Sequence, residues 1–544
     1  MPGKAAHRPE HTIAPEMTRS ATPRAALASI ALAAGAVALA FTWQPGLATF
    51  HDDSASYLVM AQAYSPWQSA SAPVAAQAPF EKYPPLFPLA LALLGAAYEW
   101  QWAHAIVALS FAAAVFLLGV YAARIGGSSA CGIAAAILFA ALPGAWLNLK
   151  GILSEFPYMA LTFGTLAWVA RRTPGTPFER RHAIGMAALL AAVMLTRTIG
   201  FTLVLAIGIA EAASYRRTRD SERLREIVLA LASSVAAVIA WYVLRPSGGD
   251  DAYVSSSAGV VERLRNDGLA YLGSLALGNA RALFDAWLNA LVIYWGEAWQ
   301  PKFLGGALIA LAMAAATLAR ARRAHADAIY VLLFLAVLIA WPFPGQMYRL
   351  ALPVFPIALA IALAAVPGLT ARRLDPRASA RTAGYAALVP LAFCVPALFY
   401  IAERARQPGR EIMEYYRIPF RPDAESTAAL QSRAFGDMAH IRETTPAGAS
   451  VMWYGPAYIA LLASRRGVPL DYPRDAKDMA AQLARARPDF VYLSRVHPRD
   501  SARRLGDPLA PARLLESLAD PVWSRPGPDG KPEAALFAVR KEAR

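Results

Sequence analysis

Charged residues are scarce in this sequence of 544 residues. Asp, Glu, Lys and Arg make up 17% of it, whereas a typical soluble domain has about a quarter. Hydrophobic residues make up 57%, and the mean hydropathy is +0.35. The charge deficit is concentrated in apolar runs that are each roughly long enough to cross the hydrocarbon layer of a bilayer. These runs predict a polytopic α-helical membrane protein.

Cysteine and histidine are also rare. The two cysteines, Cys131 and Cys394, both fall inside predicted spans, which excludes a disulfide framework and a cysteine-based zinc site. His51 and His104 are too few to indicate zinc. No RNA- or DNA-binding motif is present, so we expect no nucleic-acid partner. Membrane topology explains the net charge of +15 better.

About eleven spans are predicted, and two further apolar pieces, 84–97 and 283–298, read as helices that lie in the interface or re-enter it. If both cross, the count reaches thirteen. Ala38-Leu39-Ala40 fits a signal-peptide cleavage site, but the preceding run is long, so we expect a retained first helix. The predicted spans are 25–43, 103–123, 130–147, 156–170, 183–196, 198–213, 227–244, 303–319, 328–341, 350–369 and 384–401.

The loops between these spans alternate in charge. One set holds 21 Lys and Arg in 77 residues, and the other holds 9 in 134. Because short loops rich in Lys and Arg stay in the cytoplasm, the sequence predicts a cytoplasmic N-terminal segment, 1–24. It is followed by a membrane domain, 25–401, with an outside loop, 44–102, and by an outside C-terminal domain, 402–544. The loops in the first set are 1–24, 124–129, 171–182, 214–226, 320–327 and 370–383.

The C-terminal region contains 23 of the 53 Lys and Arg residues and has short alternating elements. Strand-like runs at 450–454, 490–493 and 535–539 flank helix-like stretches such as Asp475 to Arg487, which predicts a small α/β domain. No Gly-rich phosphate loop or nucleophile elbow occurs there. We expect this domain to be a lid or docking module without chemistry of its own.

Candidate chemistry begins with Asp52 and Asp53, which follow the first span. A carboxylate there can cap the helix predicted from Ser54, act as a base or bind a metal. Capping needs only one of the two carboxylates, so capping and catalysis are compatible. Tyr57 follows Asp53 by four residues, which puts both on one helical face.

The second candidate pair is Glu81 and Lys82. The two residues could be a surface pair in the interface. However, Lys82 is the only Lys or Arg in the outside loop 44–102. A single cation next to the Pro84-Pro85 break at headgroup depth is well placed to hold a lipid phosphate.

Three further charges lie at span boundaries on the same predicted side: Glu155, Arg197 and Arg349. Each could be a solvated or structural charge, but isolated arginines at such depths usually line a cavity or face a partner. A sugar transfer from a lipid phosphate needs a base that deprotonates the acceptor and cations that stabilise the departing phosphate. These residues and the outside loop provide both.

In order and sidedness, these residues resemble the motifs of the GT-C superfamily of polyprenyl-phosphate-sugar glycosyltransferases. They are most similar to bacterial relatives of the protein mannosyltransferases and of the lipid A aminoarabinose transferase. Tyr83 is inserted before the proline in the second segment, and Glu155 stands where Asp is common. The segments that carry the resemblance are Asp52-Asp53 with Tyr57, Phe80-Glu81-Lys82-Tyr83-Pro84, Leu153-Ser154-Glu155-Phe156-Pro157 and Tyr348-Arg349 through Pro356.

The resemblance implies an inverting transfer of a sugar from a polyprenyl-phosphate donor to an outside-facing lipid, glycan or protein acceptor. It implies Asp53 as the base with Asp52 as its partner, or the reverse, with Glu155 as a further acidic residue. Tyr57, Glu81, Lys82, Arg197 and Arg349 would bind substrate. It also implies a bacterial inner membrane with a periplasmic C-terminal domain. Metal use varies in the superfamily, so a divalent metal stays open.

Two other functions are compatible with parts of the sequence. A lipid or sugar transporter would suit the many spans, although we find no internal repeat. An O-antigen polymerase or ligase would use outside arginines but does not need the early Asp52-Asp53 pair. Neither alternative explains the whole one-sided set of charges as directly.

Overall fold

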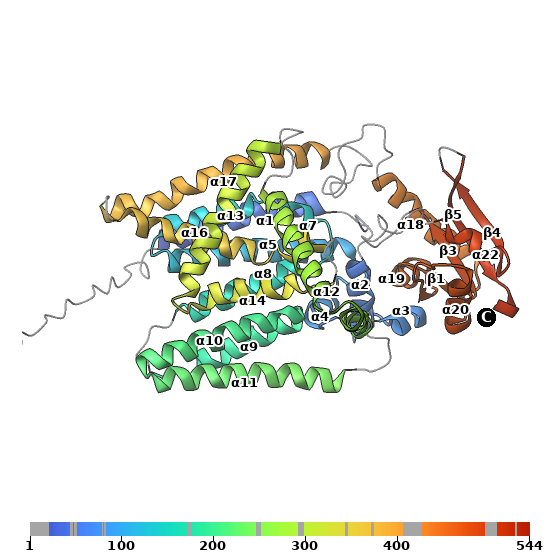
Figure 1. Ribbon diagram of the computed structural model, residues 1–544, viewed down its shortest axis with the longest axis horizontal. Coiled ribbons are helices and arrows are strands. Elements are labelled where there is room, and N and C mark those ends of the chain that lie inside the picture. The colour runs from blue at the N-terminus through green and yellow to red at the C-terminus, as the bar shows by residue number, and fades with distance from the viewer. Residues whose placement is uncertain are drawn as a thin grey trace, which may run out of the picture.

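The chain forms a bundle of helices followed by a small domain with a β-sheet (Figure 1). The structure is a computed structural model. It describes residues 21–43, 47, 52–78, 80, 83–171, 177–245, 252–291, 299–342, 346–371, 375–405, 427–495, 509–527 and 530–543.

Helices dominate the membrane part, which agrees with the predicted fold class. They are α1 (Ala21–Thr42), α2 (Asp52–Tyr64), α3 (Ala72–Gln77), α4 (Leu86–Leu93), α5 (Trp100–Ile125), α6 (Ser129–Ala140), α7 (Pro143–Leu149), α8 (Glu155–Val169), α9 (Arg180–Thr196), η2 (Thr198–Gly200), α10 (Phe201–Thr218), α11 (Ser221–Leu244), α12 (Ala252–Leu291), α13 (Trp299–Ala321), α14 (Ala326–Ile339), α15 (Met347–Leu350), α16 (Phe355–Thr370) and α17 (Pro376–Ala405).

Each of the eleven predicted spans coincides with helix in the structure. In the described part of the chain, six helices are long and apolar enough to cross a membrane, and the bent pair α6 and α7 would make a seventh. Pro143 begins α7, and the pair bends by 51° at this break. The protein is therefore a multi-pass membrane protein, and the number of eleven spans remains a prediction.

The two pieces predicted to lie in the interface have different structures. Residues 84–97 contain the short helix α4, and residues 283–291 are the end of α12, while 292–298 lie outside the described residues. Helix α12 is interrupted at Gly268, whose φ of 60° lies in the left-handed region that favours glycine.

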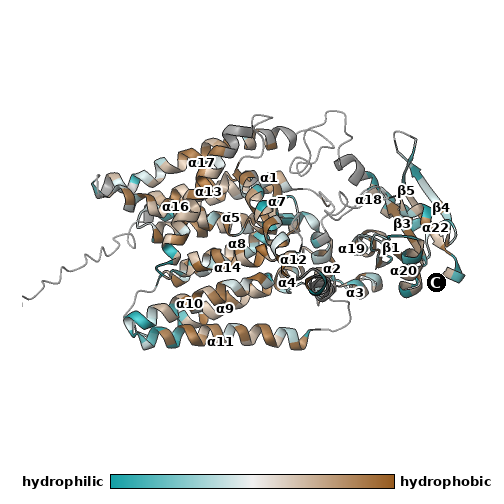
Figure 2. Ribbon diagram, viewed as in Figure 1, coloured by the Kyte–Doolittle hydropathy of each residue, from teal (hydrophilic) through white to brown (hydrophobic). Residues whose placement is uncertain are grey.

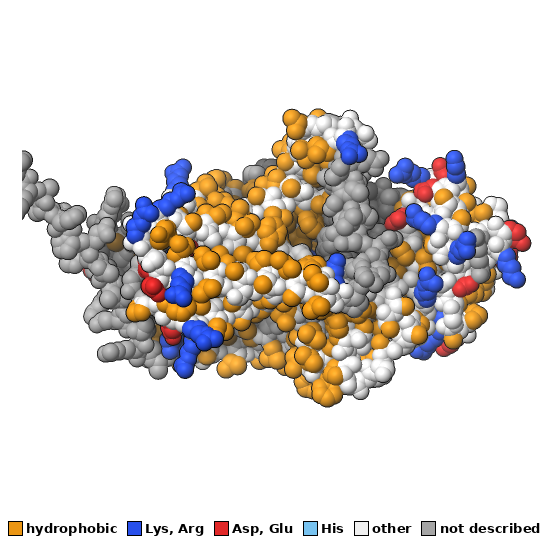
Figure 3. Space-filling view, turned by 90° about the horizontal axis from the view of Figure 1, so that it is seen from below, with side chains coloured by type: hydrophobic (Ala, Val, Ile, Leu, Met, Phe, Trp, Pro, Cys, Tyr) orange, Lys and Arg blue, Asp and Glu red, His pale blue; other side chains and the backbone are white. Residues whose placement is uncertain are grey.

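Hydrophobic residues are frequent along the helices of the bundle (Figure 2), and hydrophobic side chains cover much of the face that is seen from the side of α11 (Figure 3). On α11, Ile239 is 57% exposed and Val243 is 74% exposed. Lys and Arg gather at the end of the bundle remote from the sheet domain (Figure 3). An apolar belt with cations at one end is the surface expected of a protein embedded in lipid.

Contacts between helix ends group the loops as the charge pattern predicts. At one end of the bundle, Tyr121 bonds to Asp327, which also pairs with Arg320, and Arg217 donates to the carbonyl of Arg323. These residues lie in or next to three loops of the basic set. The structure thus places these three loops of the basic set at one end of the bundle, while which set faces the cytoplasm stays a prediction.

The C-terminal domain is α/β, as expected. A five-stranded sheet has the order β2-β1-β3-β5-β4, with β1 parallel to β2 and β3, and β5 antiparallel to β3 and β4. Its elements are α18 (Thr427–Thr444), β1 (Ser450–Trp453), α19 (Pro456–Tyr458), η5 (Ile459–Ala463), β2 (Arg466–Pro469), α20 (Ala476–Ala486), β3 (Phe490–Ser494), α22 (Pro511–Leu515), β4 (Ala519–Pro526), β5 (Pro532–Val539) and η6 (Lys541–Ala543).

This domain packs against the predicted outside loop of the membrane part, where α2 and α3 contact α19, η5 and β2 (Figure 1). Ala55 of α2 is fully buried in the hydrophobic core of the C-terminal domain. Val59 of α2, Val74 of α3 and Ala460 of η5 form a small cluster of their own. Helix α2 is therefore covered by the bundle on one side and by the C-terminal domain on another.

Candidate active site

The candidate site forms at one end of the bundle, where two helices begin and two other segments are interrupted. Helix α2 begins at Asp52, so Asp53 lies in its first turn, and α8 begins at Glu155. Arg197 is an extended residue, with φ −148° and ψ 132°, between α9 and η2. Arg349 belongs to the one-turn helix α15, which precedes α16. Interruptions of helix thus bring all four charges to one place.

Arg349 connects the two carboxylates. Its Nη2 lies 2.5 Å from Oδ2 of Asp53, and its Nε lies 3.2 Å from Oε1 of Glu155. The side chain of Arg349 is 8% exposed, that of Asp53 is 20% exposed, and that of Glu155 is 1% exposed. Asp53 therefore has the most access to a ligand among these three groups.

Arg197 completes the charge balance on the other side of Glu155. Its Nη1 lies 2.6 Å from Oε1 of Glu155 and donates to Oγ of Ser154 at 3.3 Å. Two arginines thus face two carboxylates in a largely buried place. Removing one member of such a buried set leaves a charge uncompensated, which typically costs about 3–5 kcal/mol.

Two tyrosines hold this network in place. The hydroxyl of Tyr83 donates to Oδ1 of Asp53 at 2.7 Å, and the hydroxyl of Tyr57 is 2.8 Å from Oγ of Ser154. The rings of Tyr57 and Tyr83 pack edge to face with centroids 5.0 Å apart, and Phe87 packs against Tyr57 in the same way. Burial, and then the charge of Asp53, raise the pKa of Tyr57, so its hydroxyl stays protonated.

The structure brings five of the eight predicted site residues together: Asp53, Tyr57, Glu155, Arg197 and Arg349. Glu81, Lys82 and the side chain of Asp52 lie outside the described residues. Tyr83 and Ser154 were not predicted as site residues. Both stand in the sequence segments that carry the GT-C resemblance, but nothing in a sequence reveals contacts between residues 30 and 97 positions apart.

The described residues do not form a metal site. No group of three or more His, Cys, Asp or Glu side chains among them could hold an ion. The guanidinium group of Arg349 lies between the carboxylates of Asp53 and Glu155, where a shared metal would have to bind.

The fold is similar to that of solved membrane glycosyltransferases. The archaeal oligosaccharyltransferase AglB from Archaeoglobus fulgidus, in complex with an inhibitory peptide and a dolichol-phosphate, has a TM-score of 0.51 and 12% identity, covering 96% of this chain and 75% of AglB. Its apo form has a TM-score of 0.50 and 12% identity, covering 95% and 74%.

The chain has a GT-C fold. The sequence motifs predicted this fold, and the comparison with these two structures confirms it. ArnT from Cupriavidus metallidurans bound to undecaprenyl phosphate is also similar, with a TM-score of 0.49 and 15% identity over 96% of this chain and 99% of ArnT. No family model and no curated protein matches the sequence.

Proposed function

We propose that this protein is an integral-membrane glycosyltransferase of the GT-C type. It moves a sugar from a polyprenyl-phosphate donor to an outside-facing lipid, glycan or protein acceptor. The observation that carries the proposal is the position of Arg349 between Asp53 and Glu155, next to Arg197. A transfer from a lipid phosphate needs a base and cations side by side, and this site contains both.

The proposed reaction is a single displacement with inversion. The acceptor's hydroxyl or amine attacks the anomeric carbon of the sugar from the face opposite the phosphate, and Asp53 accepts the proton that the acceptor loses. The bond between the anomeric carbon and the phosphate oxygen breaks, and its electron pair leaves with the polyprenyl phosphate. Asp52 is either the partner of Asp53 in this role or the base itself.

Arg349 and Arg197 bind the phosphate and stabilise its growing negative charge. Both are neutralised by carboxylates in the structure, Arg349 by Asp53 and Glu155, and Arg197 by Glu155. A donor phosphate therefore competes with Asp53 for Arg349. Because Glu155 is buried and stays in place between the arginines, the exchange releases Asp53, the more exposed carboxylate, at the moment when the donor is bound.

The segment around Tyr83 contributes to donor binding in this proposal. Tyr83 bonds to Asp53, and Lys82 precedes it directly in the sequence, so Lys82 is within one residue of the site. We assign Lys82 to the donor phosphate and Glu81 to the substrate. Tyr57 orients Ser154 and, through it, Arg197.

The orientation in this proposal rests on the charge pattern of the loops, and the bacterial inner membrane rests on the resemblance to bacterial GT-C enzymes. We place the protein in a bacterial inner membrane with its N-terminus in the cytoplasm and its C-terminal domain in the periplasm. The donor and acceptor would then meet at the periplasmic surface, where residues 44–102 and the C-terminal domain lie.

Reconstitution tests the reaction itself. Purified protein is incubated in detergent with lipids extracted from a strain that lacks it, and polyprenyl phosphate release and the modified acceptor are measured by mass spectrometry. We expect both products with the wild type and neither with Asp53→Asn. A transporter would leave the donor intact in detergent, so an unchanged donor with folded wild-type protein would contradict the proposal. The deletion strain should accumulate the donor and lose one surface decoration, which names the sugar.

A further inference from the structure

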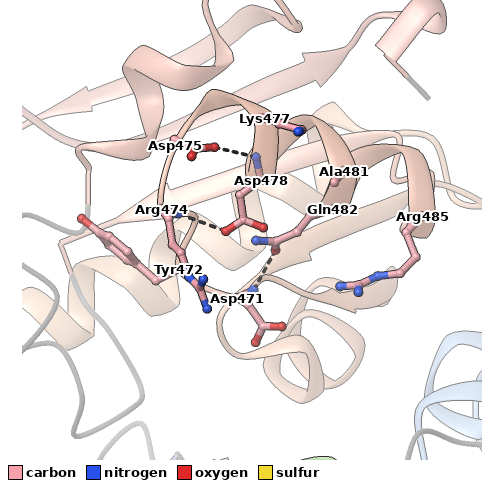
Figure 4. Close-up of a pocket in the computed structure, with 9 residues that line it drawn as sticks. All are labelled: Asp471, Tyr472, Arg474, Asp475, Lys477, Asp478, Ala481, Gln482 and Arg485. Atoms are coloured by element: carbon pink, nitrogen blue, oxygen red, sulfur yellow. Dashed lines mark hydrogen bonds between the residues drawn. The ribbon is translucent and has the colours of Figure 1, made fainter. Parts of the chain in front are cut away.

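Charged side chains line an open groove between the loop after β2 and the exposed side of α20, but they do not meet at one point (Figure 4). The guanidinium groups of Arg474 and Arg485 lie apart, on either side of Asp471. The carboxylates of Asp475 and Asp478 accept hydrogen bonds from backbone amides of the same loop and helix. These two carboxylates hold the local backbone, and the groove indicates no single ligand.

The groups around Asp53 do converge, and they divide the two oxygens of its carboxylate between them. Oδ2 pairs with Nη2 of Arg349 at 2.5 Å, and Oδ1 accepts a hydrogen bond from the hydroxyl of Tyr83 at 2.7 Å. A donor phosphate attracts the charged Arg349 away from Oδ2, but it has no such attraction for the neutral hydroxyl of Tyr83. The two oxygens of Asp53 are therefore not equivalent.

Packing and a proline restrict the position of Tyr83. Its side chain is buried, and its ring packs edge to face on that of Tyr57 with centroids 5.0 Å apart. Phe87 of α4 packs against Tyr57 at 5.2 Å, which ties the ring pair to that helix. Pro84 follows Tyr83 directly, and a proline limits the backbone conformations of the residue before it. Tyr83 is thus held in place independently of Arg349.

Tyr83 is also the residue by which this sequence departs from the Glu-Lys-Pro segment that it resembles. In that segment the lysine directly precedes the proline, whereas here Tyr83 stands between Lys82 and Pro84. The inserted residue is the one whose hydroxyl reaches Asp53. An insertion that provides a hydrogen-bond donor to the proposed base indicates a role in orienting that base.

We propose that Tyr83 is a positioning residue for Asp53 and that Oδ2 of Asp53 is the atom that takes the acceptor's proton. This assignment rests on the proposed function. When the donor phosphate binds Arg349, Oδ2 loses its partner, while Tyr83 still donates to Oδ1. The acceptor's hydroxyl or amine transfers its proton to Oδ2. Oδ1 then becomes the carbonyl oxygen of the carboxylic acid and still accepts from Tyr83, which keeps its own proton.

The pH dependence of turnover tests this role. Tyr83→Phe keeps the ring and removes the hydroxyl. Because a hydrogen bond to an ionised carboxylate favours the ionised form, its loss should move the acidic limb of kcat by about one pH unit to higher pH and lower the plateau about tenfold. The other charged and titratable groups around Asp53 and Arg349 are unchanged in this variant; in the described residues they include Glu155, Arg197, Tyr57 and Tyr348.

Tyr64→Phe is the matched control for Tyr83→Phe. Tyr64 lies on α2, the helix that carries Asp53, and its buried hydroxyl has no hydrogen-bond partner among the described residues. Removing it should change neither the plateau of kcat nor the acidic limb. Thermal unfolding of both variants checks that they are folded.

A fluorine probe tests the contact without any sugar transfer. Tyr83 is replaced by a tyrosine that is fluorinated next to its hydroxyl, and the fluorine NMR signal of the protein in detergent is followed against pH. We expect the signal to shift as Asp53 ionises and this shift to be absent in Asp53→Asn. With added undecaprenyl phosphate the titration should remain but with a higher midpoint, because Arg349 no longer stabilises the carboxylate.

Several outcomes would overturn the proposal. They are a wild-type plateau and acidic limb in Tyr83→Phe, an equal change in Tyr64→Phe, and a fluorine signal that titrates equally in Asp53→Asn. Loss of the titration on adding undecaprenyl phosphate would mean that Asp53 leaves Tyr83 together with Arg349, which contradicts the assignment of Oδ2. A wild-type protein that shows the fluorine titration but transfers no sugar would instead contradict the proposed function.

Discussion

Ala55 and Tyr57 lie two positions apart on α2 but are buried in different hydrophobic cores. Ala55 belongs to the core of the C-terminal domain, and Tyr57 belongs to that of the helical bundle. Residues two apart on a helix do not share a face, so each core holds its own side of α2. Asp53 lies one turn before Tyr57, and both domains therefore fix the position of the proposed base.

A larger side chain in the contact between α2 and the C-terminal domain should lower kcat. Ala460 is fully buried beside Val59, and Ala460→Leu adds volume that the contact has no room for. Overpacking of this kind costs about 1–3 kcal/mol. We expect a lower kcat, because α2 shifts Asp53 out of position while Arg197 and Arg349 lie on other segments.

Ala534→Leu is the matched control for Ala460→Leu. Ala534 is equally buried but belongs to β5, inside the C-terminal domain. The Ala534→Leu substitution should lower thermal stability without changing the kcat of the folded protein. Equal losses of kcat in the two variants would mean that the domain contact does not position Asp53.

Replacing the proposed base should abolish transfer. Asp53→Asn keeps the shape of the side chain and a hydrogen bond to Tyr83, but it cannot accept a proton. Loss of a general base typically lowers turnover by about 10²–10⁴-fold. Turnover of Asp53→Asn and Asp52→Asn should be compared in detergent, with thermal unfolding as the check on folding. Near-normal turnover in both variants would leave these carboxylates as helix caps.

Neutralising the cations should weaken donor binding. A cation on the leaving phosphate acts in the ground state and in the transition state, so Arg349→Ala and Lys82→Ala should raise the KM for the donor and also lower kcat. Asp53→Asn should mainly lower kcat. Donor affinity measured for all three variants separates these roles. Unchanged affinity in both cation variants would assign the phosphate to Arg197 or to other residues.

The buried pair of Glu155 and Arg197 should show non-additive stability. Arg197→Met leaves the buried carboxylate of Glu155 with Arg349 as its remaining cation among the described residues. We expect a loss of up to about 3–5 kcal/mol in the free energy of unfolding. Adding Glu155→Gln removes the uncompensated charge and should recover part of the loss. If the double variant is as unstable as the sum of the two single ones, the pair contributes nothing through its charge.

Reporter fusions test the orientation of the chain. A reporter that is active only in the periplasm should be active after Arg544, since the loop charges predict an outside C-terminal domain. The same reporter after Arg323, in a loop of the basic set, should be inactive. The reverse result at both positions would invert the topology, and activity at both would mean that the span count is wrong by one between them.

The helices of the predicted spans could be predicted well. A chain segment that crosses the bilayer must satisfy its backbone hydrogen bonds within itself, so a long apolar run forms a helix whatever it packs against. Strands form by pairing with other strands, which the sequence does not show, so some strands were predicted correctly and others were missed. Strands β1, β3 and β5 lie at the predicted runs, and α20 fills the predicted Asp475 to Arg487. Strands β2 and β4 were missed because they contain glycine and prolines, which rarely occur in strands. Pairing with β1 and β5 forms them nonetheless.

Parts of the site could not be predicted for a related reason. Charge is costly near lipid, so the sequence reveals that Glu155, Arg197 and Arg349 need partners. It does not reveal which partner each one has. The link of Arg349 to both Asp53 and Glu155, and the support from Tyr83 and Ser154, arise from tertiary packing across distant segments. The neutral hydroxyl groups of Tyr83 and Ser154 occur in many environments, so the sequence does not indicate that they need partners.

The double burial of α2 also determines when the site can be completed during synthesis. Asp53 and Ala55 are synthesised well before Ala460 and the core that encloses Ala55. Domains generally fold as units in the order of their synthesis. In a nascent chain, the membrane bundle can thus be folded while the side of α2 that the C-terminal domain later buries is still exposed. The proposed site would then be complete only once the C-terminal domain has folded against α2.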